Sequence, residues 1–216
     1  MSRRWLGSVL LLAVTLLAAA CSSSVSSTRG PHRFGADDPT VQVDSSQLRK
    51  LKAAAGIEDC PVSVDSSPPT AEGLPDITLP CLGGGRDVDM AGLRGTPLVL
   101  NFWSQTCGPC RAESPRFQDF HQAAGDRVRV IGVDWLDPRP AYAIGFADEL
   151  GLTYPQLADP EGVTRAPLRI TALPITILVS ADGRVVHTEY GAIDSVNDLS
   201  ELVADHLGES IEVVRR

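Results

Sequence analysis

The amino-acid sequence predicts an α/β fold in which a central mixed sheet is flanked by helices. Apolar runs of strand length alternate along the chain with segments of helical periodicity. Near the C-terminus, two strand-like runs follow each other across an Asp182-Gly183 turn, which is a hairpin signal. Alternating strands and helices around one core are typical of a sheet covered by helices on both faces.

An additional helix and a small hairpin are expected before this sheet. Residues 45–58 have a helical pattern, and the apolar face of this helix is expected to comprise Leu48, Leu51 and Ala55. LPDITL (74–79) alternates apolar and polar residues, as half-buried strands do. A glycine turn at 83–85 and a short returning strand at 86–90 complete the expected hairpin.

The main sheet and its helices are expected in the rest of the chain. The expected strands are TPLVLNFW (96–103), RVRVIGVDW (127–135), ITILVS (175–180) and RVVHTEY (184–190). The expected helices are 111–124, 140–150, 163–170 and 198–207. The sequence shows no internal repeat and no coiled-coil heptads.

Composition divides the chain into four segments. They are a signal peptide at 1–20, a flexible tether at 21–45, a helix with a linker at 46–73 and the main domain at 74–210. The tether is rich in Ser, Asp, Gly and Pro and has few large apolar residues, so it cannot bury enough surface to fold.

The first 21 residues have the pattern of an export signal. Arg3 and Arg4 precede an uncharged stretch from Leu6 to Ala20, which is short for a membrane-spanning helix. The small residues directly before Cys21 resemble a bacterial lipoprotein signal, in which that cysteine receives the lipid. An uncleaved N-terminal anchor and cleavage to a free protein are the alternatives. All three place the domain outside the cytoplasm, with a membrane contact in the first two.

Charge and cysteine content narrow the possible partners. The chain has 19 Lys and Arg against 27 Asp and Glu, a net charge of −8. Binding to nucleic acid needs clustered basic side chains, so no nucleic-acid partner is expected. Four cysteines remain if Cys21 carries lipid, and disulfides between them suit an oxidising compartment.

The strongest chemical signal is Cys107-Gly108-Pro109-Cys110, which follows an expected strand and opens an expected helix. Backbone N–H groups at a helix N-terminus carry partial positive charge, which would stabilise a thiolate at Cys107 and lower its pKa. Cys110, one turn further along, is then the resolving thiol. Gly108 leaves room for a disulfide partner, and Pro109 presets the first helical turn. This chemistry is thiol-disulfide exchange, which needs no cofactor besides the cysteine pair.

Two other interpretations of the motif are weaker. A C-x-x-C pair can be half of a zinc site, but Cys60 and Cys81 lack ligand spacing and the four histidines form no paired motif. No metal is therefore expected. A purely structural bridge across so small a loop would remove little chain entropy.

The surrounding residues resemble a known family. NFWSQTCGPCRAESP (101–115) is similar to the membrane-associated thioredoxin-like thiol-disulfide oxidoreductases of the TlpA and ResA group, whose motif looks like N-F-W-A-x-W-C-x-x-C-R-x-E-x-P. ALPITILVSADGRVV (172–186) resembles the second signature of that group, and LRG (93–95) also matches. The resemblance covers residues from about 74 to 207 and implies a thioredoxin fold.

The resemblance implies roles for residues outside the motif. Pro174 corresponds to the cis-proline that faces the active site, with Leu173 before it, and the backbone there pairs with the substrate chain like an added strand. Trp103 is expected to pack beside the site. The plainer alternatives are that Pro174 merely starts a strand and that Trp103 is a core aromatic residue.

The same comparison raises the question of proton transfer and partner choice. Asn101 stands where cytoplasmic thioredoxins carry a buried Asp, so Glu113 and Asp137 become the candidates. A solvated carboxylate is nevertheless the favoured interpretation of both. Thr106 departs from the Trp that the family carries before the first cysteine. Together with the bulky Leu173, it is expected to alter partner choice.

Cys60 and Cys81 lie outside the shared motif. A disulfide between them would staple the N-terminal helix to the edge of the domain and stabilise it by about 3 kcal/mol in the chain-entropy estimate. The alternative is a second redox-active pair that relays electrons to Cys107 and Cys110. The secreted context favours the structural staple.

Three functions follow from these residues. The first is a thiol-disulfide oxidoreductase acting on exported proteins. The resemblance implies reduction of apocytochrome c or similar substrates, with oxidation as the alternative, and a membrane redox donor or acceptor. The second is a copper-delivery lipoprotein, because two thiolates suit Cu(I), although extra Met or His ligands are missing. The third, a peroxidase, would need a peroxidatic cysteine in a pocket of its own.

Overall fold

The computed structural model describes residues 40–64, 70 and 72–213 of the chain. The expected signal peptide, Cys21 and most of the expected tether therefore lie outside the described residues. Within those ranges, none of the helices combines the length and the hydropathy that are needed to cross a bilayer.

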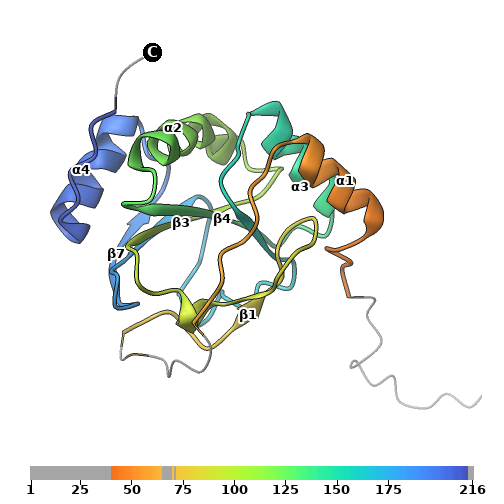
Figure 1. Cartoon of the computed structure of the whole chain (residues 1–216), viewed down its shortest axis with the longest axis horizontal. Coiled ribbons are helices and arrows are strands. Elements are labelled where there is room, and N and C mark those ends of the chain that lie inside the picture. The colour runs from red at the N-terminus through yellow and green to blue at the C-terminus, as the bar shows by residue number, and fades with distance from the viewer. Residues whose placement is uncertain (1–39, 65–69, 71, 214–216) are drawn as a thin grey trace, which may run out of the picture. The chain divides into compact units, whose positions relative to one another are not determined.

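A five-stranded mixed sheet forms the centre of the fold (Figure 1). Its strand order is β5-β4-β3-β6-β7. The strands are β3 (Leu98–Trp103), β4 (Arg129–Trp135), β5 (Gln156–Asp159), β6 (Ile175–Val179) and β7 (Val185–Tyr190). β3, β4 and β5 run parallel, whereas β6 is antiparallel to both β3 and β7. Every residue of β3 is buried, as both faces of this central strand are covered.

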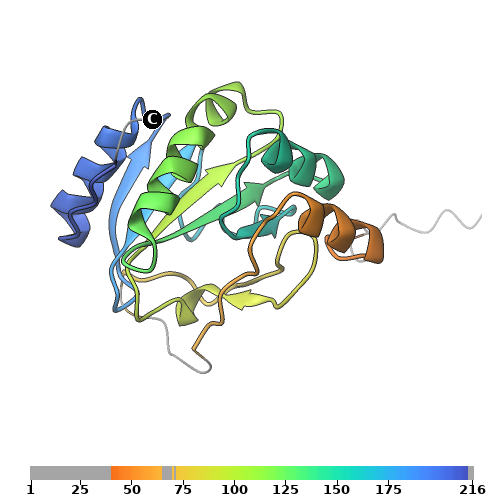
Figure 2. The same cartoon turned by 45° about the horizontal axis from the view of Figure 1, so that its top comes forward.

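The α-helices all pack against one apolar cluster. They are α1 (Ser46–Ala54), α2 (Gly108–Ala124), α3 (Pro140–Glu149) and α4 (Val196–Leu207). Leu48, Phe117, Ile144 and Leu199, one from each helix, share this cluster with Val99 of β3. Figure 2 shows α2 lying across the sheet and α1 beside α3. Among the described residues, the expectation of helices on both faces is therefore wrong.

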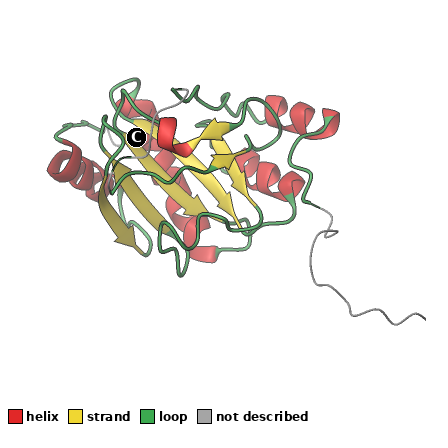
Figure 3. Cartoon of the chain, turned by 90° about the horizontal axis from the view of Figure 1, so that it is seen from below, coloured by secondary structure: helices red, strands yellow, loops and turns green. Residues whose placement is uncertain are grey.

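The opposite face of the sheet is covered by a hairpin, a single turn of 3-10 helix and loops, which Figure 3 shows from below. These elements are β1 (Thr78–Leu79), β2 (Val88–Asp89) and η1 (Met90–Gly92). Leu79, Val88 and Met90 form a second apolar cluster with Phe102 and Ile177 of the sheet. The expected strand over 74–79 is paired at its last two residues, and Pro75 within it has no N–H to donate.

Two expectations between residues 150 and 175 are wrong. The segment 163–170 forms turns instead of a helix. Pro167 lacks a helical N–H donor and Arg169 has a positive φ of 54°, and neither suits a continuous helix. The strand β5 was not expected, because it has four residues and both Gln156 and Asp159 are polar. Both are buried with hydrogen-bond partners, so the apolar pattern of a core strand is missing.

The helix α1 also differs from its expected face. Ser45 caps it by accepting the N–H of Leu48 at 3.2 Å. The buried side chains are Leu48 and Lys52, while Leu51 is 37% exposed. The helix therefore presents a lysine to the interior, one turn after its apolar anchor.

A glycine in the central sheet provides a test of this packing. A Cβ added to Gly132 of β4 would meet the Gln156 amide and stand 2.8 Å from Trp103 Nε1. We expect Gly132→Ala to lower the free energy of unfolding by roughly 1–3 kcal/mol in urea denaturation. Gly145→Ala on α3 is the control, since nothing lies within 4 Å of that Cβ, and a helical Ala is favoured by up to about 1 kcal/mol. Equal effects of the two changes would contradict the described packing.

Candidate active site

The C-x-x-C motif lies at the junction of β3 and α2. β3 ends at Trp103, and α2 begins at Gly108, three residues earlier than expected, because Cys107 caps the helix. Its Sγ accepts the N–H of Cys110 at 3.2 Å, and Pro109 occupies the first turn, where no donor is needed. A sulfur in this position faces the positive end of the helix, which stabilises a thiolate.

The two cysteines differ in access. They form a disulfide with their Cα atoms 5.2 Å apart. Cys107 is half-buried between exposed neighbours, whereas Cys110 has no exposed surface. An external sulfur can therefore approach Cys107 but not Cys110.

The peptide bond between Leu173 and Pro174 is cis and leads into β6. Because Phe102 of β3 pairs with Ile175 of β6, Pro174 lies beside the end of β3 that leads to the cysteines. Leu173 is half-buried and packs against both apolar clusters. The structure thus brings the two sequence signatures to the same end of the sheet.

Trp103 fixes the end of β3. Its ring is completely buried and stacks on Phe146 of α3, with 4.6 Å between ring centroids. Its Nε1 donates to Gln156 Oε1 at 2.9 Å, which ties β3 to β5. Thr106, further along the loop, is exposed, and its hydroxyl lies 3.2 Å from that of Ser104. The surface next to Cys107 is accordingly polar at this position.

Glu113 is completely buried, so the expectation of a solvated carboxylate is wrong for this residue. One oxygen accepts Asn101 Nδ2 at 2.8 Å, and the other accepts the N–H of Ile193 at 2.9 Å. Burial raises the pKa of Glu113 to about 7, and it outweighs these hydrogen bonds and the charge of Arg116, which lower the pKa. Glu113 follows Cys110 by three residues on α2 and thus shares its helix face.

Asp137 is also buried, which again contradicts the solvated interpretation. Its Oδ1 accepts the N–H of Arg139 at 3.0 Å. Asp134, a residue that the sequence reasoning missed, is 1% exposed beside Trp103 in the β3–β4 register. Burial, reinforced by the charge of Asp137, raises the pKa of Asp134 well above its ordinary value. The signal available in the sequence was a single acid within the apolar run RVRVIGVDW.

A comparison with known families identifies the chain. Residues 70–188 match the model of the AhpC/TSA family, a segment that contains the cysteine pair and the cis-proline. This chain belongs to the AhpC/TSA family. Within that family, its relatives place it among the thioredoxin-like thiol-disulfide oxidoreductases.

Three relatives of this AhpC/TSA member illustrate the similarity. The chain is 33% identical over 132 residues to thiol:disulfide interchange protein DsbE of Xylella fastidiosa, covering 60% of this chain and 66% of the relative. It is 31% identical over 107 residues to thiol-disulfide oxidoreductase ResA of Oceanobacillus iheyensis, covering 49% and 55%. A secreted disulfide oxidoreductase of Mycobacterium tuberculosis has a similar structure, with 28% identity, a TM-score of 0.54 and coverage of 60% and 96%.

The chain spans about half to two thirds of the length of these curated relatives. The thioredoxin-like fold and the resemblance to the TlpA and ResA group are confirmed.

Because the pKa of Glu113 is raised, we expect the stability of this AhpC/TSA member to depend on pH. Its pKa is about 7 in the folded protein, against an ordinary value of 4.5. The folded state holds this proton more tightly, so the stabilisation is complete below about pH 4.5 and is lost as the pH rises through about 7. Relative to Glu113→Gln, the wild-type protein should lose on the order of 3 kcal/mol of unfolding free energy between about pH 4.5 and pH 8.

Urea denaturation of the fully oxidised proteins measures this difference. Asp134 titrates in the same direction in both proteins and cancels. Glu201→Gln, a change at an exposed position of α4, is the control and should leave the pH dependence of wild type unchanged. Parallel pH profiles for wild type and Glu113→Gln would rule out the raised pKa.

Proposed function

We propose that this protein is an extracytoplasmic oxidoreductase that reduces disulfides of exported proteins, such as apocytochrome c, through Cys107 and Cys110. The observation that supports it most is the asymmetry of the pair. Cys107 is accessible and caps α2, whereas Cys110 is fully buried one turn further along. A nucleophile needs access and thiolate stabilisation, and a resolving thiol needs proximity to the first sulfur.

The reaction begins with the reduced pair. The Cys107 thiolate attacks one sulfur of the substrate disulfide, a mixed disulfide forms, and the other substrate sulfur leaves as a thiolate that takes up a proton. Cys110 then loses its proton and attacks Cys107 Sγ. The second substrate sulfur leaves, the Cys107–Cys110 disulfide forms, and the substrate has gained two electrons and two protons. A membrane dithiol donor would return the pair to the reduced state.

Glu113 supports the second step in this proposal. A buried thiol such as Cys110 cannot pass its proton directly to water. Glu113 shares its helix face, and its carboxyl has a pKa of about 7, so it is suited to accept a proton near neutral pH. Asn101, which donates to the Glu113 carboxylate, holds it in place.

The cis-proline segment and the residues beside it bear on substrate choice, and the N-terminal residues bear on where the protein is located. The cis Leu173–Pro174 segment offers a backbone edge for the substrate chain, and Thr106 with Leu173 would set the preference among partners. The catalytic domain comprises 74–210, joined through 46–73 to a tether. We place it outside the cytoplasm, anchored through lipid on Cys21, on the strength of the signal-like residues 1–21.

The reduction potential of Cys107–Cys110 tests the function. The protein is equilibrated in dithiothreitol or glutathione buffers, and thiols are counted for each cysteine pair by alkylation and mass spectrometry. A value near the ~−270 mV of thioredoxin supports a reductant, whereas a value near ~−120 mV would make the protein an oxidant. Absence of a reversible couple, with Cys107→Ser behaving like wild type, would leave a thiol-based binding module, for example one for copper.

A second prediction concerns the resolving step. In the Glu113→Gln variant, the rate at which the reduced substrate is released from the mixed disulfide should fall by at least about tenfold. This rate should also lose its pH dependence near neutrality. Attack by Cys107 should be nearly unchanged. Glu201→Gln on α4, an exposed site, is the matched control. Quenched-flow trapping of the mixed disulfide distinguishes the two steps, and equal release rates in all three proteins would exclude Glu113 as the proton acceptor.

A further inference from the structure

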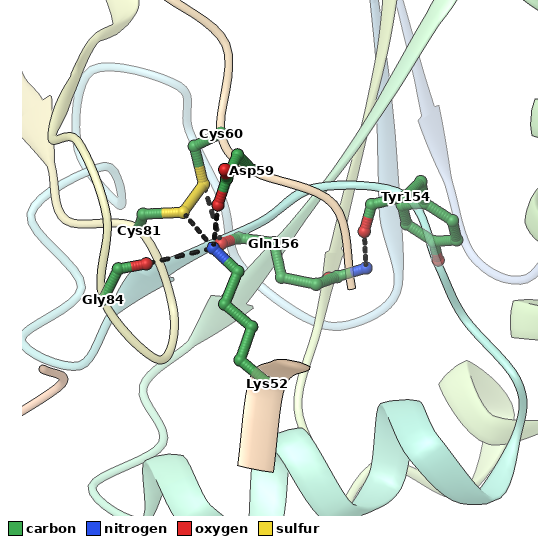
Figure 4. Close-up of a disulfide and its surroundings, with 7 residues drawn as sticks. All are labelled: Lys52, Asp59, Cys60, Cys81, Gly84, Tyr154 and Gln156. Carbon is green, nitrogen blue, oxygen red and sulfur yellow. Dashed lines mark hydrogen bonds and ion pairs between the residues drawn. A yellow bond between two sulfur atoms is a disulfide. The ribbon is translucent and has the colours of Figure 1, made fainter. Parts of the chain in front are cut away.

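A second disulfide lies away from the active site, next to a buried lysine. Cys60, which follows α1, is bonded to Cys81, which follows β1, with their Cα atoms 5.9 Å apart. Both belong to the apolar cluster on the hairpin side of the sheet, whereas Cys110 belongs to the helical side. Figure 4 shows the Lys52 amino group pointing at this disulfide from the end of its side chain. The two cysteine pairs therefore have separate surroundings.

Lys52 places a buried positive charge beside an uncharged disulfide. It is 5% exposed, and its Nζ lies 3.2 Å from Cys81 Sγ and 3.0 Å from the carbonyl oxygen of Gly84. Among the described residues, the carboxylate within ion-pair distance is that of Asp59, at 3.4 Å, and its side chain is 96% exposed. Solvent weakens such a pair, so the buried ammonium is poorly compensated while Cys81 is in a disulfide.

The other charges around Lys52 compensate it only in part. The pKa of Asp44 is lowered chiefly by its hydrogen bond to Arg49 and in smaller part by the charge of Lys52, so Asp44 does interact with that charge. The hydrogen bond and ion pair of Asp44 are made to another cation, however, because it is bonded to Arg49 at 2.7 Å. Glu58 is bonded to His121 instead. A thiolate at Cys81 would place a full negative charge at the position that the neutral sulfur now occupies. The site is thus electrostatically better suited to the reduced state of Cys81 than to the disulfide.

The sulfur of Cys60 lies beside a carbonyl oxygen, whereas that of Cys81 lies beside an ammonium group. Cys60 Sγ lies 3.3 Å from the backbone carbonyl oxygen of Gln156, which can accept an S–H but repels a thiolate (Figure 4). Cys60 is also the more exposed of the two, at 7% against 1% for Cys81. Once the bond is broken, Cys60 is therefore expected as a thiol and Cys81 as a thiolate.

We propose that Cys60–Cys81 is a second thiol-disulfide exchange site, in which Cys60 receives the external sulfur and Cys81 leaves as a thiolate paired with Lys52. The partner is a protein dithiol of the thioredoxin type. Its thiolate attacks Cys60, a mixed disulfide forms, and the Cys81 thiolate is released beside the ammonium. The second thiol of the partner then displaces Cys60, which takes up a proton. The partner is oxidised to a disulfide and this pair is reduced, so two electrons pass between them.

A cleft provides space beside this site. It has a volume of about 570 Å³ and is lined by Arg49, Lys52, Asp59 and the glycines Gly83, Gly84 and Gly85. A Cβ at Gly85 would stand 3.5 Å from Cys81 Sγ, so this exposed glycine covers the disulfide with backbone alone. In this proposal the partner sulfur reaches Cys60 from the cleft, because Asp59, its neighbour in the chain, lines the cleft.

The first test measures the Cys81 thiol directly. In full-length Cys60→Ser, the rate of iodoacetamide alkylation at Cys81 is followed against pH while Cys107–Cys110 stays oxidised. The pKa should lie below the ~8.5 of a free thiol, and Lys52→Met should raise it by about one unit or more. Lys52→Arg should keep it low. Lys50→Met is the matched control, because Lys50 is exposed on the same helix and should have no effect.

The second test starts from the intact disulfide and needs no cysteine substitution. The full-length protein is treated with dithiothreitol or a reduced thioredoxin, and differential alkylation with mass spectrometry follows each cysteine pair separately. Reduction of Cys60–Cys81 should slow about fivefold or more in Lys52→Met, recover in Lys52→Arg and be unchanged in Lys50→Met. Equal rates in all variants, or a Cys60–Cys81 bond that stays closed where Cys107–Cys110 is fully reduced, would overturn the proposal and leave a structural staple. The Cys107–Cys110 readout in the same samples reports independently on the proposed function.

Discussion

The position of Cys107 at the N-terminus of α2 depends on how β3 is held in the sheet. β3 is the central strand, and the buried Trp103 at its end is fixed by Phe146 and Gln156. The chain then has four residues in which to turn into the helix, and Cys107 becomes the cap. The access of one sulfur, the burial of the other and the backbone donors that face the first all follow from this junction.

Buried polar groups gather around this end of the sheet. Glu113 is bonded to Asn101 and to the backbone of Ile193, while Asp134 and Asp137 lie close enough for their charges to interact. Burying a carboxyl group costs stability, and here the cost appears as raised pKa values for Glu113 and Asp134. Glu113, three residues after Cys110 on α2, can therefore hold or release a proton near neutral pH, and thiol-disulfide exchange both consumes and releases protons.

The two disulfides are made asymmetric by different means. At Cys107 and Cys110, the helix end stabilises one sulfur and burial shields the other. At Cys60 and Cys81, a lysine side chain faces one sulfur and a carbonyl oxygen faces the other. A helix terminus is a local feature of the chain, whereas the second arrangement joins α1, the loop after β1 and strand β5. It therefore depends on the complete fold.

The sequence by itself determined the local features of this protein. The strands β3, β4 and β6 were predicted because each is an apolar run, and β7 because it follows β6 across the Asp182-Gly183 turn. The C-x-x-C motif with its flanking residues indicated both the fold and the chemistry. The tertiary structure decided what these patterns leave open. Gln156 lies buried in a strand because the distant Trp103 pairs with its side chain, and Asp159 because the turn that follows it supplies the donors of Val163 and Thr164. The segment around Pro167 forms turns in place of the expected helix. Glu113, Asp137 and Lys52 are charged types that a sequence places at the surface. Their burial depends on segments far away along the chain, so only the packed structure shows that they face the two cysteine pairs and the end of the sheet.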